Sequence, residues 1–509
     1  MRLSALRRPR DMSSNGAAAS TGAKSVAWPG VLAVAAAASA VRLLFAGRYG
    51  FHRDELYYVT GGWRLDPGYV DHPLLLPWLA GATERLFGPS LHALRLWPIA
   101  AGAASIVLAA LIAAELGGAA RAQRLAALAT ALCPFFFIAH QVFQTNFADQ
   151  LVWTAALVVL LRGVRRAPAD APLPARTWLG FGGLAAVGFL AKYTVGALGV
   201  ALVIALALRR RREFRNPFLY LGGALALLGL LPGAAWQLAH GLPFLEFAAA
   251  KEDWMPWASL AVQVLMVGPA TVPLVVAGAL LLLRRRDTGL VGWVALLAMG
   301  LFLAVLAKPY YANAVWVPLF GAGGVALGRS RRRWPEALLL GNLAILPLLF
   351  PLLPVERYAR LPDPIGELAE TVGWPELVDQ VDEALAELPA GEDVDLVVLT
   401  ANYGEAAALE LLGRRLEADA PLRRAVVISG HNSYAFWIEE SLQGRSLDRL
   451  VLVGYPVEWV GRWYEEAIEL ATIGNPWGID NEERGAAVVL GRLPRLSREE
   501  LIRAWTHYN

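Results

Sequence analysis

Over the first 354 residues, apolar runs about as long as a membrane-crossing helix alternate with short polar segments. An α-helix needs about 20 apolar residues to cross the hydrocarbon core of a bilayer. The pattern therefore predicts a polytopic α-helical membrane protein with about eleven transmembrane helices. The predicted spans are residues 26–46, 92–116, 123–141, 146–162, 177–191, 194–208, 218–237, 258–283, 289–307, 311–328 and 335–354.

Arginine is concentrated in every second connection between these spans, and such enrichment marks cytoplasmic loops. These connections and the N-terminal tail, residues 1–25, are therefore expected in the cytoplasm. The tail is rich in Arg, Ser, Gly and Ala, which predicts disorder. The arginines of the connections are Arg121, Arg124, Arg162, Arg165, Arg166, Arg176, Arg209 to Arg212, Arg215, Arg284 to Arg286, Arg329 and Arg331 to Arg333.

The segment 177–208 has arginine on both sides, so it must cross the membrane an even number of times. Two short helices that meet near Lys192 satisfy this requirement. Lys192 is then expected near the outer surface, at the depth of the lipid headgroups.

After about residue 355 charged residues become frequent, and short apolar runs alternate with helical patterns. The runs "DVDLVVLT", "RAVVISG", "DRLVLVGYP" and "GAAVVLG" predict buried strands, and "GEAAALELLGRRLEA" predicts a helix. We expect a soluble α/β domain over residues 355–509, outside the cytoplasm because the number of spans is odd. The segments "NYGEA" and "SGHNSY" follow predicted strands, where either a ligand site or a plain turn is expected.

The composition agrees with a membrane protein. Hydrophobic residues make up 56% of the chain and charged residues 17%, against about 25% charged residues in soluble domains. The only cysteine, Cys133, lies in an apolar run, so no disulfide can form within the chain. The net charge of +3 says little by itself, because the arginines are clustered. For a membrane protein of this kind no nucleic-acid partner is expected.

The first outer loop, residues 47–91, carries an unusual density of acids, bases and aromatic side chains, as in "FHRDELYYVTGGWRLDPGYVDHPLLLPWL". Asp54 and Glu55 stand at the membrane face, where an unpaired carboxylate is costly. Pairing with Arg53 and Arg64 as interfacial anchors is one explanation. The number of acids and the aromatic lining favour a functional site instead. The segment "PLLLPWLAGATERLFG" predicts a helix in the plane of the interface.

These motifs, in this order, resemble the bacterial glycosyltransferase family 39 proteins. That family is related to the protein O-mannosyltransferases and to the lipid A aminoarabinose transferase, on the integral-membrane GT-C fold. The one clear departure is "DHPLL" where relatives have a second proline. The segments that carry the resemblance are "FHRDELYYV", "GYVDHPLLLPWLA", "HQVFQTNFADQLVWT", "FLAKYTVGALG", "KPYYANAVWVPLF", "ANYGEAAAL" and "ISGHNSYAFW".

The resemblance implies transfer of a sugar from a polyprenyl-phosphate carrier to a cell-envelope acceptor, a lipid, glycan or protein, on the outer face of the plasma membrane. The leaving phosphate departs without a proton, so one carboxylate that accepts the proton of the acceptor hydroxyl is enough. Asp54 is the candidate general base and Glu55 the reserve.

The departing phosphate needs cations, and Lys192 and Lys308 are isolated lysines predicted at outer helix ends. Each is followed by tyrosine, Tyr193 in one case and Tyr310 in the other. The alternative is that each ammonium reaches for the lipid headgroups. Arg53 is a further candidate for the phosphate.

Asp71, His72, Asp149 and Tyr193 are the candidates for binding the substrates. Asp149 either orients the sugar or a divalent cation, or it only stabilises the start of a helix. No second histidine stands at ligand spacing from His72, so no metal site or other cofactor is firmly implied.

Two other classes of protein fit the pattern of spans. A transporter or lipid flippase would carry ionisable residues near the bilayer midplane, whereas the acids here gather at one surface. A polymerase or ligase of lipid-linked glycans would differ only in its substrates.

Overall fold

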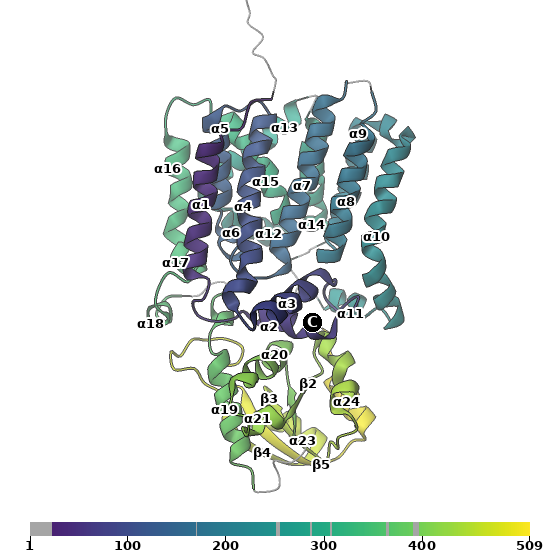
Figure 1. Ribbon diagram of the computed structural model, residues 1–509, viewed down its shortest axis with the longest axis vertical. Coiled ribbons are helices and arrows are strands. Elements are labelled where there is room, and N and C mark those ends of the chain that lie inside the picture. The colour runs from purple at the N-terminus through teal and green to yellow at the C-terminus, as the bar shows by residue number, and fades with distance from the viewer. Residues whose placement is uncertain are drawn as a thin grey trace, which may run out of the picture.

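The computed structural model describes residues 23–168, 171–250, 255–285, 288–305, 308–362, 366–389 and 396–508. All but the last three residues of the tail predicted over 1–25 lie outside these ranges. The described chain forms a bundle of apolar helices above a smaller unit built on a β-sheet, with α2 and α3 between them (Figure 1).

The helical part begins at Trp28 and follows the predicted spans closely. Its helices are α1 (Trp28–Phe45), α2 (Arg53–Arg64), α3 (Leu75–Phe87), α4 (Leu91–Glu115), α5 (Ala120–Ala131), α6 (Pro134–Ala139), α7 (Thr145–Arg166), α8 (Ala175–Ala191), α9 (Val195–Arg209), α10 (Pro217–Ala239), α11 (Pro243–Ala249), α12 (Pro256–Val267), α13 (Val272–Arg284), α14 (Gly289–Ala304), α15 (Trp316–Leu327), α16 (Trp334–Leu340), α17 (Leu346–Leu349) and α18 (Val355–Tyr358), with the 3-10 helix η3 (Pro309–Val315) before α15.

Four helices in the described part of the chain, α1, α4, α7 and α10, are long and apolar enough to cross a membrane. Helices α8, α9 and α14 are apolar but shorter, and α16 and α17 together make one further short apolar segment. The chain is thus a multi-pass membrane protein, and the number of eleven crossings stays a prediction.

The predicted break at Lys192 is confirmed, since α8 ends at Ala191 and α9 begins at Val195. The span predicted over 258–283 is present as two helical segments, α12 and the segment that follows it to Arg284, which bend by 84° at the break between them. The bend is at Gly268, whose φ of +86° favours glycine. A Cβ there would lie 2.6 Å from Oδ1 of Asn342.

Glycines bring α8 and α10 into close contact. A Cβ on Gly182 would lie 2.1 Å from the carbonyl oxygen of Gly222, and one on Gly229 equally close to that of Ala186. Small residues at such positions let two membrane helices approach closely.

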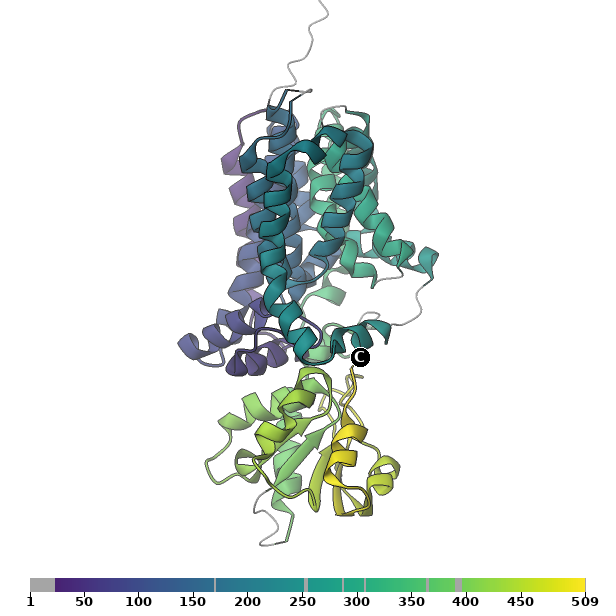
Figure 2. The same ribbon diagram turned by 90° about the vertical axis from the view of Figure 1, so that its right-hand side faces the viewer.

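Helices α2 and α3 lie across the lower end of the bundle (Figures 1 and 2). The helix predicted over "PLLLPWLAGATERLFG" is present as α3. Its Leu86 and Phe87 side chains are exposed, as expected of a helix whose apolar face lies in lipid.

The C-terminal part contains a five-stranded sheet in the order β2-β1-β3-β5-β4. β1 is parallel to β2 and β3, and β5 is antiparallel to β3 and β4. The strands are β1 (Val397–Thr400), β2 (Val426–Ser429), β3 (Arg449–Val453), β4 (Tyr464–Thr472) and β5 (Ala487–Pro494), and the helices are α19 (Trp374–Ala386), α20 (Tyr403–Leu412), α21 (Pro421–Arg424), α22 (Ile438–Leu442), α23 (Val457–Trp463) and α24 (Arg498–Trp505).

The sequence pattern predicted four of the five strands and missed β4. β4 is an edge strand with the sequence "YEEAIELAT", and its glutamates are exposed. Charged side chains on an edge strand hinder pairing with other chains, and they also remove the apolar run by which a strand is recognised.

The C-terminal part from α19 to α24, called the sheet unit below, packs on α2 and on the loop that follows α2. The Ser433 backbone N–H donates to the Tyr57 hydroxyl at 3.2 Å, and the Ser433 hydroxyl accepts from the backbone N–H of Val70 at 3.0 Å. The indole N–H of Trp437 donates to Asp66 at 3.0 Å. The segments that follow β1 and β2 therefore face the first outer loop, where the candidate site lies.

Candidate active site

The first turn of α2 carries the candidate base. His52 caps this helix: its ring nitrogen Nδ1 accepts from the Asp54 backbone N–H at 3.1 Å, and Glu55 accepts from the His52 N–H at 2.8 Å. Such reciprocal capping satisfies two backbone donors that a helix start leaves without partners. It therefore fixes the direction in which Arg53, Asp54 and Glu55 leave the helix.

Asp54 is half-buried, and each of its carboxylate oxygens accepts one hydrogen bond. The Tyr403 hydroxyl donates to Oδ1 at 3.0 Å, and the Gln144 amide donates to Oδ2 at 3.3 Å. Each carboxylate oxygen can accept more than one hydrogen bond. The oriented carboxylate therefore keeps capacity to accept a proton from a substrate hydroxyl.

Tyr403 comes from α20 of the sheet unit, and its ring stacks on Tyr57 of α2 at 4.5 Å between centroids. Burial, and after it the charge of Asp54, raises the pKa of the Tyr403 phenol well above its usual value. Tyr403 therefore keeps its proton and remains a donor to Asp54.

Glu55 is fully buried and paired with Arg95 of α4. The guanidinium donates to both carboxylate oxygens, at 2.9 and 2.8 Å, and the Phe143 N–H donates to Oε1 at 2.9 Å. Every oxygen of Glu55 is thus occupied by groups of the protein. This geometry favours a positioning role for Glu55 over that of reserve base.

Arg53, predicted to bind the donor phosphate, instead faces carboxylates of the C-terminal part. Its guanidinium pairs with Glu370 at 3.3 Å and with Glu482, and it lies over the Tyr403 ring. These partners favour a role in joining the two parts of the chain.

Lys192 lies at the end of α8, and its ammonium donates to Oδ1 of Asn146 at 2.8 Å. It also lies over the rings of Tyr310 and Tyr311, 5.1 and 4.6 Å from their centroids. Cation–π contacts of this kind hold a cation without neutralising it. Lys192 therefore stays available to an anionic ligand.

A chain of hydrogen bonds links Lys192 to Asp54. Asn146, which accepts from Lys192, donates to Gln144 at 3.4 Å, and Gln144 donates to Asp54 at 3.3 Å. Lys308 is exposed and lies two residues before Tyr310, over whose ring the Lys192 ammonium lies.

Asp149 is fully buried in the first turns of α7. Its Oδ1 accepts from the Thr194 hydroxyl at 2.8 Å, while Oδ2 has no hydrogen-bond partner among the described residues. The Tyr193 hydroxyl likewise has none within the described ranges, and its ring packs on Phe244. Both groups are suited to bind a substrate.

Asp71 and His72 lie beside the aromatic rings of α2. Asp71 accepts from the Tyr57 hydroxyl at 3.1 Å and lies 3.7 Å from Nε2 of His72. Burial raises the pKa of Asp71, and the charge of His72 opposes that shift. His72 packs against Tyr57, Tyr58 and Tyr69.

Tyr57 and Gln144 were not predicted as site residues. Tyr403 was expected only as part of "NYGEA", where the sequence left a ligand site or a plain turn open, and Gln144 lies in "HQVFQTNFADQLVWT", which carried the family resemblance. No spacing signal joins a residue near position 400 to one near position 54. Across the described ranges, no group of three or more His, Cys, Asp or Glu side chains could hold a metal ion.

Comparison with solved structures shows the same architecture in a known enzyme. ArnT from Cupriavidus metallidurans in the apo state shares 17% sequence identity with the chain, with 90% of this chain and 97% of ArnT covered and a TM-score of 0.59. ArnT bound to undecaprenyl phosphate shares 15% identity over 91% of this chain and 98% of ArnT, with a TM-score of 0.61. The chain has the GT-C fold.

The resemblance to GT-C glycosyltransferases that the sequence indicated is thereby confirmed. The family model of the dolichyl-phosphate-mannose-protein mannosyltransferases matches residues 71–236. The arabinofuranosyltransferase AftD from Mycobacteria, in a mutant form, shares 16% identity over 92% of this chain and 42% of AftD, with a TM-score of 0.50. A sequence search of curated proteins found no match. Together these comparisons support a membrane glycosyltransferase.

Proposed function

We propose that the chain transfers a sugar from a polyprenyl-phosphate carrier to a cell-envelope acceptor at the lower, outer end of the helix bundle. One observation supports the proposal: on a GT-C fold, the half-buried carboxylate of Asp54 and a lysine held by tyrosines, Lys192, are linked through the amides of Gln144 and Asn146. A structure of ArnT with undecaprenyl phosphate supports a carrier of that class.

In this mechanism Asp54 accepts the proton of the acceptor hydroxyl as that oxygen attacks the anomeric carbon. The carrier leaves as its phosphate, and Lys192 with Lys308 stabilises the charge that develops on it. Asp149 and Asp71 bind hydroxyl groups of the substrates. Tyr403 and Gln144 hold the base in one orientation, so little reorganisation is needed during transfer.

Asp54→Asn keeps the shape and the hydrogen bonds of the side chain but removes the base. Transfer of labelled sugar into envelope material should fall by about 10²–10⁴-fold, with undecaprenyl-phosphate affinity nearly unchanged. Asp66→Asn, on the same loop, is the matched control and should keep most activity. Full activity of Asp54→Asn would show that the first outer loop does not supply the base, and it would favour the transporter alternative.

Lys192→Met and Lys308→Met test the second half of the proposal. Each should weaken binding of undecaprenyl phosphate, with the larger loss for Lys192→Met because that ammonium is held in place by Asn146 and two tyrosines. Unchanged affinity for undecaprenyl phosphate in both variants would indicate that these lysines contact lipid headgroups instead.

A further inference from the structure

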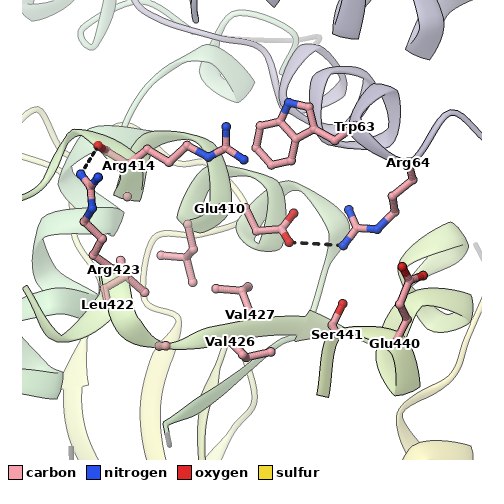
Figure 3. Close-up of a pocket in the computed structure, with 13 residues that line it drawn as sticks. Trp63, Arg64, Glu410, Arg414, Leu422, Arg423, Val426, Val427, Glu440 and Ser441 are labelled. Atoms are coloured by element: carbon pink, nitrogen blue, oxygen red, sulfur yellow. Dashed lines mark hydrogen bonds and ion pairs between the residues drawn. The ribbon is translucent and has the colours of Figure 1, made fainter. Parts of the chain in front are cut away.

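A cavity of about 480 Å³ lies between the end of α2 and the sheet unit, away from Asp54 (Figure 3). Its volume falls in the usual range of small-molecule sites, about 300–1,000 Å³. Residues from α2, α20, α21, β2 and α22 and the turns beside them line it, so both parts of the chain form its wall. We name it the junction cavity, and its wall includes Trp63, Arg64, Glu410, Arg414, Val427 and Ser441.

Two of the arginines that line the junction cavity, Arg64 and Arg414, have carboxylate partners, one in the lining and one beside it. Arg64 pairs with Glu410 at 3.4 Å, and Glu410 also accepts from the Tyr434 hydroxyl at 2.6 Å. Arg414 lies over the Trp63 ring, 3.7 Å from its centroid, and 3.8 Å from Glu84. Trp63 in turn donates to Glu84 at 3.3 Å. Guanidinium and carboxylate groups thus face the cavity with fixed directions and little net charge.

This balance of charges restricts the chemical class of the ligand. A phosphate or carboxylate would meet the carboxylates of Glu410 and Glu440, and a cation would meet Arg64, Arg414 and Arg423. A neutral ligand with many hydroxyl groups meets donors and acceptors of both kinds. The side chain of Val427 gives the cavity an apolar floor, which suits the C–H face of a sugar ring.

The cavity lies at the other end of α2 from the candidate base. Asp54 and Trp63 are nine residues apart on one helix, which corresponds to about 14 Å along its axis. A group in the cavity is therefore too far away to receive the sugar itself. Binding energy from a remote part of a substrate can still be used to speed the chemical step.

We propose that the junction cavity binds a neutral sugar portion of the acceptor, remote from the hydroxyl that is glycosylated. The inference rests on the proposed function, because it assumes that Asp54 serves an acceptor at the same loop. It identifies the acceptor as glycan-bearing, and it gives the sheet unit a part in acceptor choice.

A cysteine introduced into the cavity wall allows the cavity to be blocked by a thiol-reactive label. Cys133 is buried, so Ser441→Cys in the full-length chain supplies an accessible thiol on the cavity wall. Reaction with a bulky maleimide should lower sugar transfer into envelope acceptor by at least about tenfold, while undecaprenyl-phosphate affinity stays within about twofold. Ser446→Cys, an exposed position outside the cavity lining, should keep its transfer after the same reaction.

The same thiol reports the class of ligand. Envelope glycans are divided by anion exchange into a neutral and an acidic fraction, and each is tested for slowing the maleimide reaction of Ser441→Cys. The neutral fraction should slow it at least about threefold. The proposal is overturned if only the acidic fraction slows the maleimide reaction, or if neither fraction does. It is also overturned if labelled Ser441→Cys keeps full sugar transfer. If Asp54→Asn is inactive while labelled Ser441→Cys keeps full transfer, the sugar-binding role of the cavity is rejected and the proposed glycosyltransferase function stands. If Asp54→Asn is active, the proposed function itself is rejected.

Discussion

Glu55 and Asp54 are neighbours in sequence with opposite surroundings. Glu55 is buried against Arg95, whereas Asp54 reaches a site with open acceptor capacity. Breaking a buried pair by neutralising one partner leaves an unpaired charge, which costs about 3–5 kcal/mol. These surroundings favour a structural role for Glu55 and leave Asp54 as the proposed base.

We therefore expect Glu55→Gln to lower the thermal unfolding temperature of the purified chain in detergent, because Arg95 loses its counter-charge. The exposed pair of Glu439 with Arg498 gives the control, and Glu439→Gln should change stability little. A stable Glu55→Gln variant with lost activity would instead support Glu55 as the base.

Tyr403→Phe removes one hydrogen bond to the Asp54 carboxylate and keeps the ring stacked on Tyr57. A hydrogen bond to a charged group contributes about 1.5 kcal/mol or more, and about 1.4 kcal/mol corresponds to a tenfold change in rate. Asp54 then loses one of the two partners that orient it, so the rate of sugar transfer should fall by about tenfold. Tyr455→Phe, elsewhere in the sheet unit, should keep the rate of transfer.

At the scale of elements, the start of α20 and the turn between β4 and β5 bring buried acids together. Glu405 caps α20, and Glu483 is buried with neither oxygen hydrogen-bonded within the described part of the chain. Burial, and after it the charge of the other carboxylate, raises the pKa of Glu405 to about 8. Burial and the charge of Glu370 raise the pKa of Glu483 to about 8 as well.

Both carboxyl groups hold their protons more tightly in the folded chain than in the unfolded chain, where the pKa is about 4.5. Their contribution to stability is therefore fully present below pH 4.5 and is lost as the pH rises through about 8. We expect the unfolding temperature to fall between pH 5 and pH 8.5, and Glu483→Gln to reduce that fall. An equal fall in the variant would contradict this assignment.

At the scale of the whole molecule, the sheet unit completes the candidate site from below the helix bundle (Figure 2). Tyr403 reaches Asp54 and Ser433 reaches Tyr57, so the sheet unit must stand on the same side of the membrane as the site. The arginine distribution predicts that this side is outside.

A reporter enzyme that works only in the cytoplasm, fused after Asn509, should therefore be inactive. The same reporter fused after Arg211, in an arginine-rich connection, should be active and shows that the fusion protein is made. Activity of the C-terminal fusion would overturn the topology and move the site to the cytoplasmic side.

Local patterns in the sequence were sufficient for much of this protein. Long apolar runs require lipid or protein around them, so α1, α4, α7 and α10 could be predicted from the length and composition of those runs. The break at Lys192 followed from arginine on both flanks of a segment too long for one span. The parallel strands β1, β2 and β3 are buried, and their apolar runs identified them.

Tertiary structure decided the rest, because it depends on contacts between residues far apart in the sequence. Arg95 lies 40 positions from Glu55 and Tyr403 lies 349 positions from Asp54, and no periodicity encodes either pairing. At Gly268 the distant Asn342 side chain leaves no room for a Cβ, and the junction cavity exists only where α2 meets the sheet unit. The sequence indicated which segments are apolar enough to enter the membrane and which acids are candidates for the base. Packing between distant segments gave Asp54 and Glu55 the different surroundings that favour Asp54 as the proposed base.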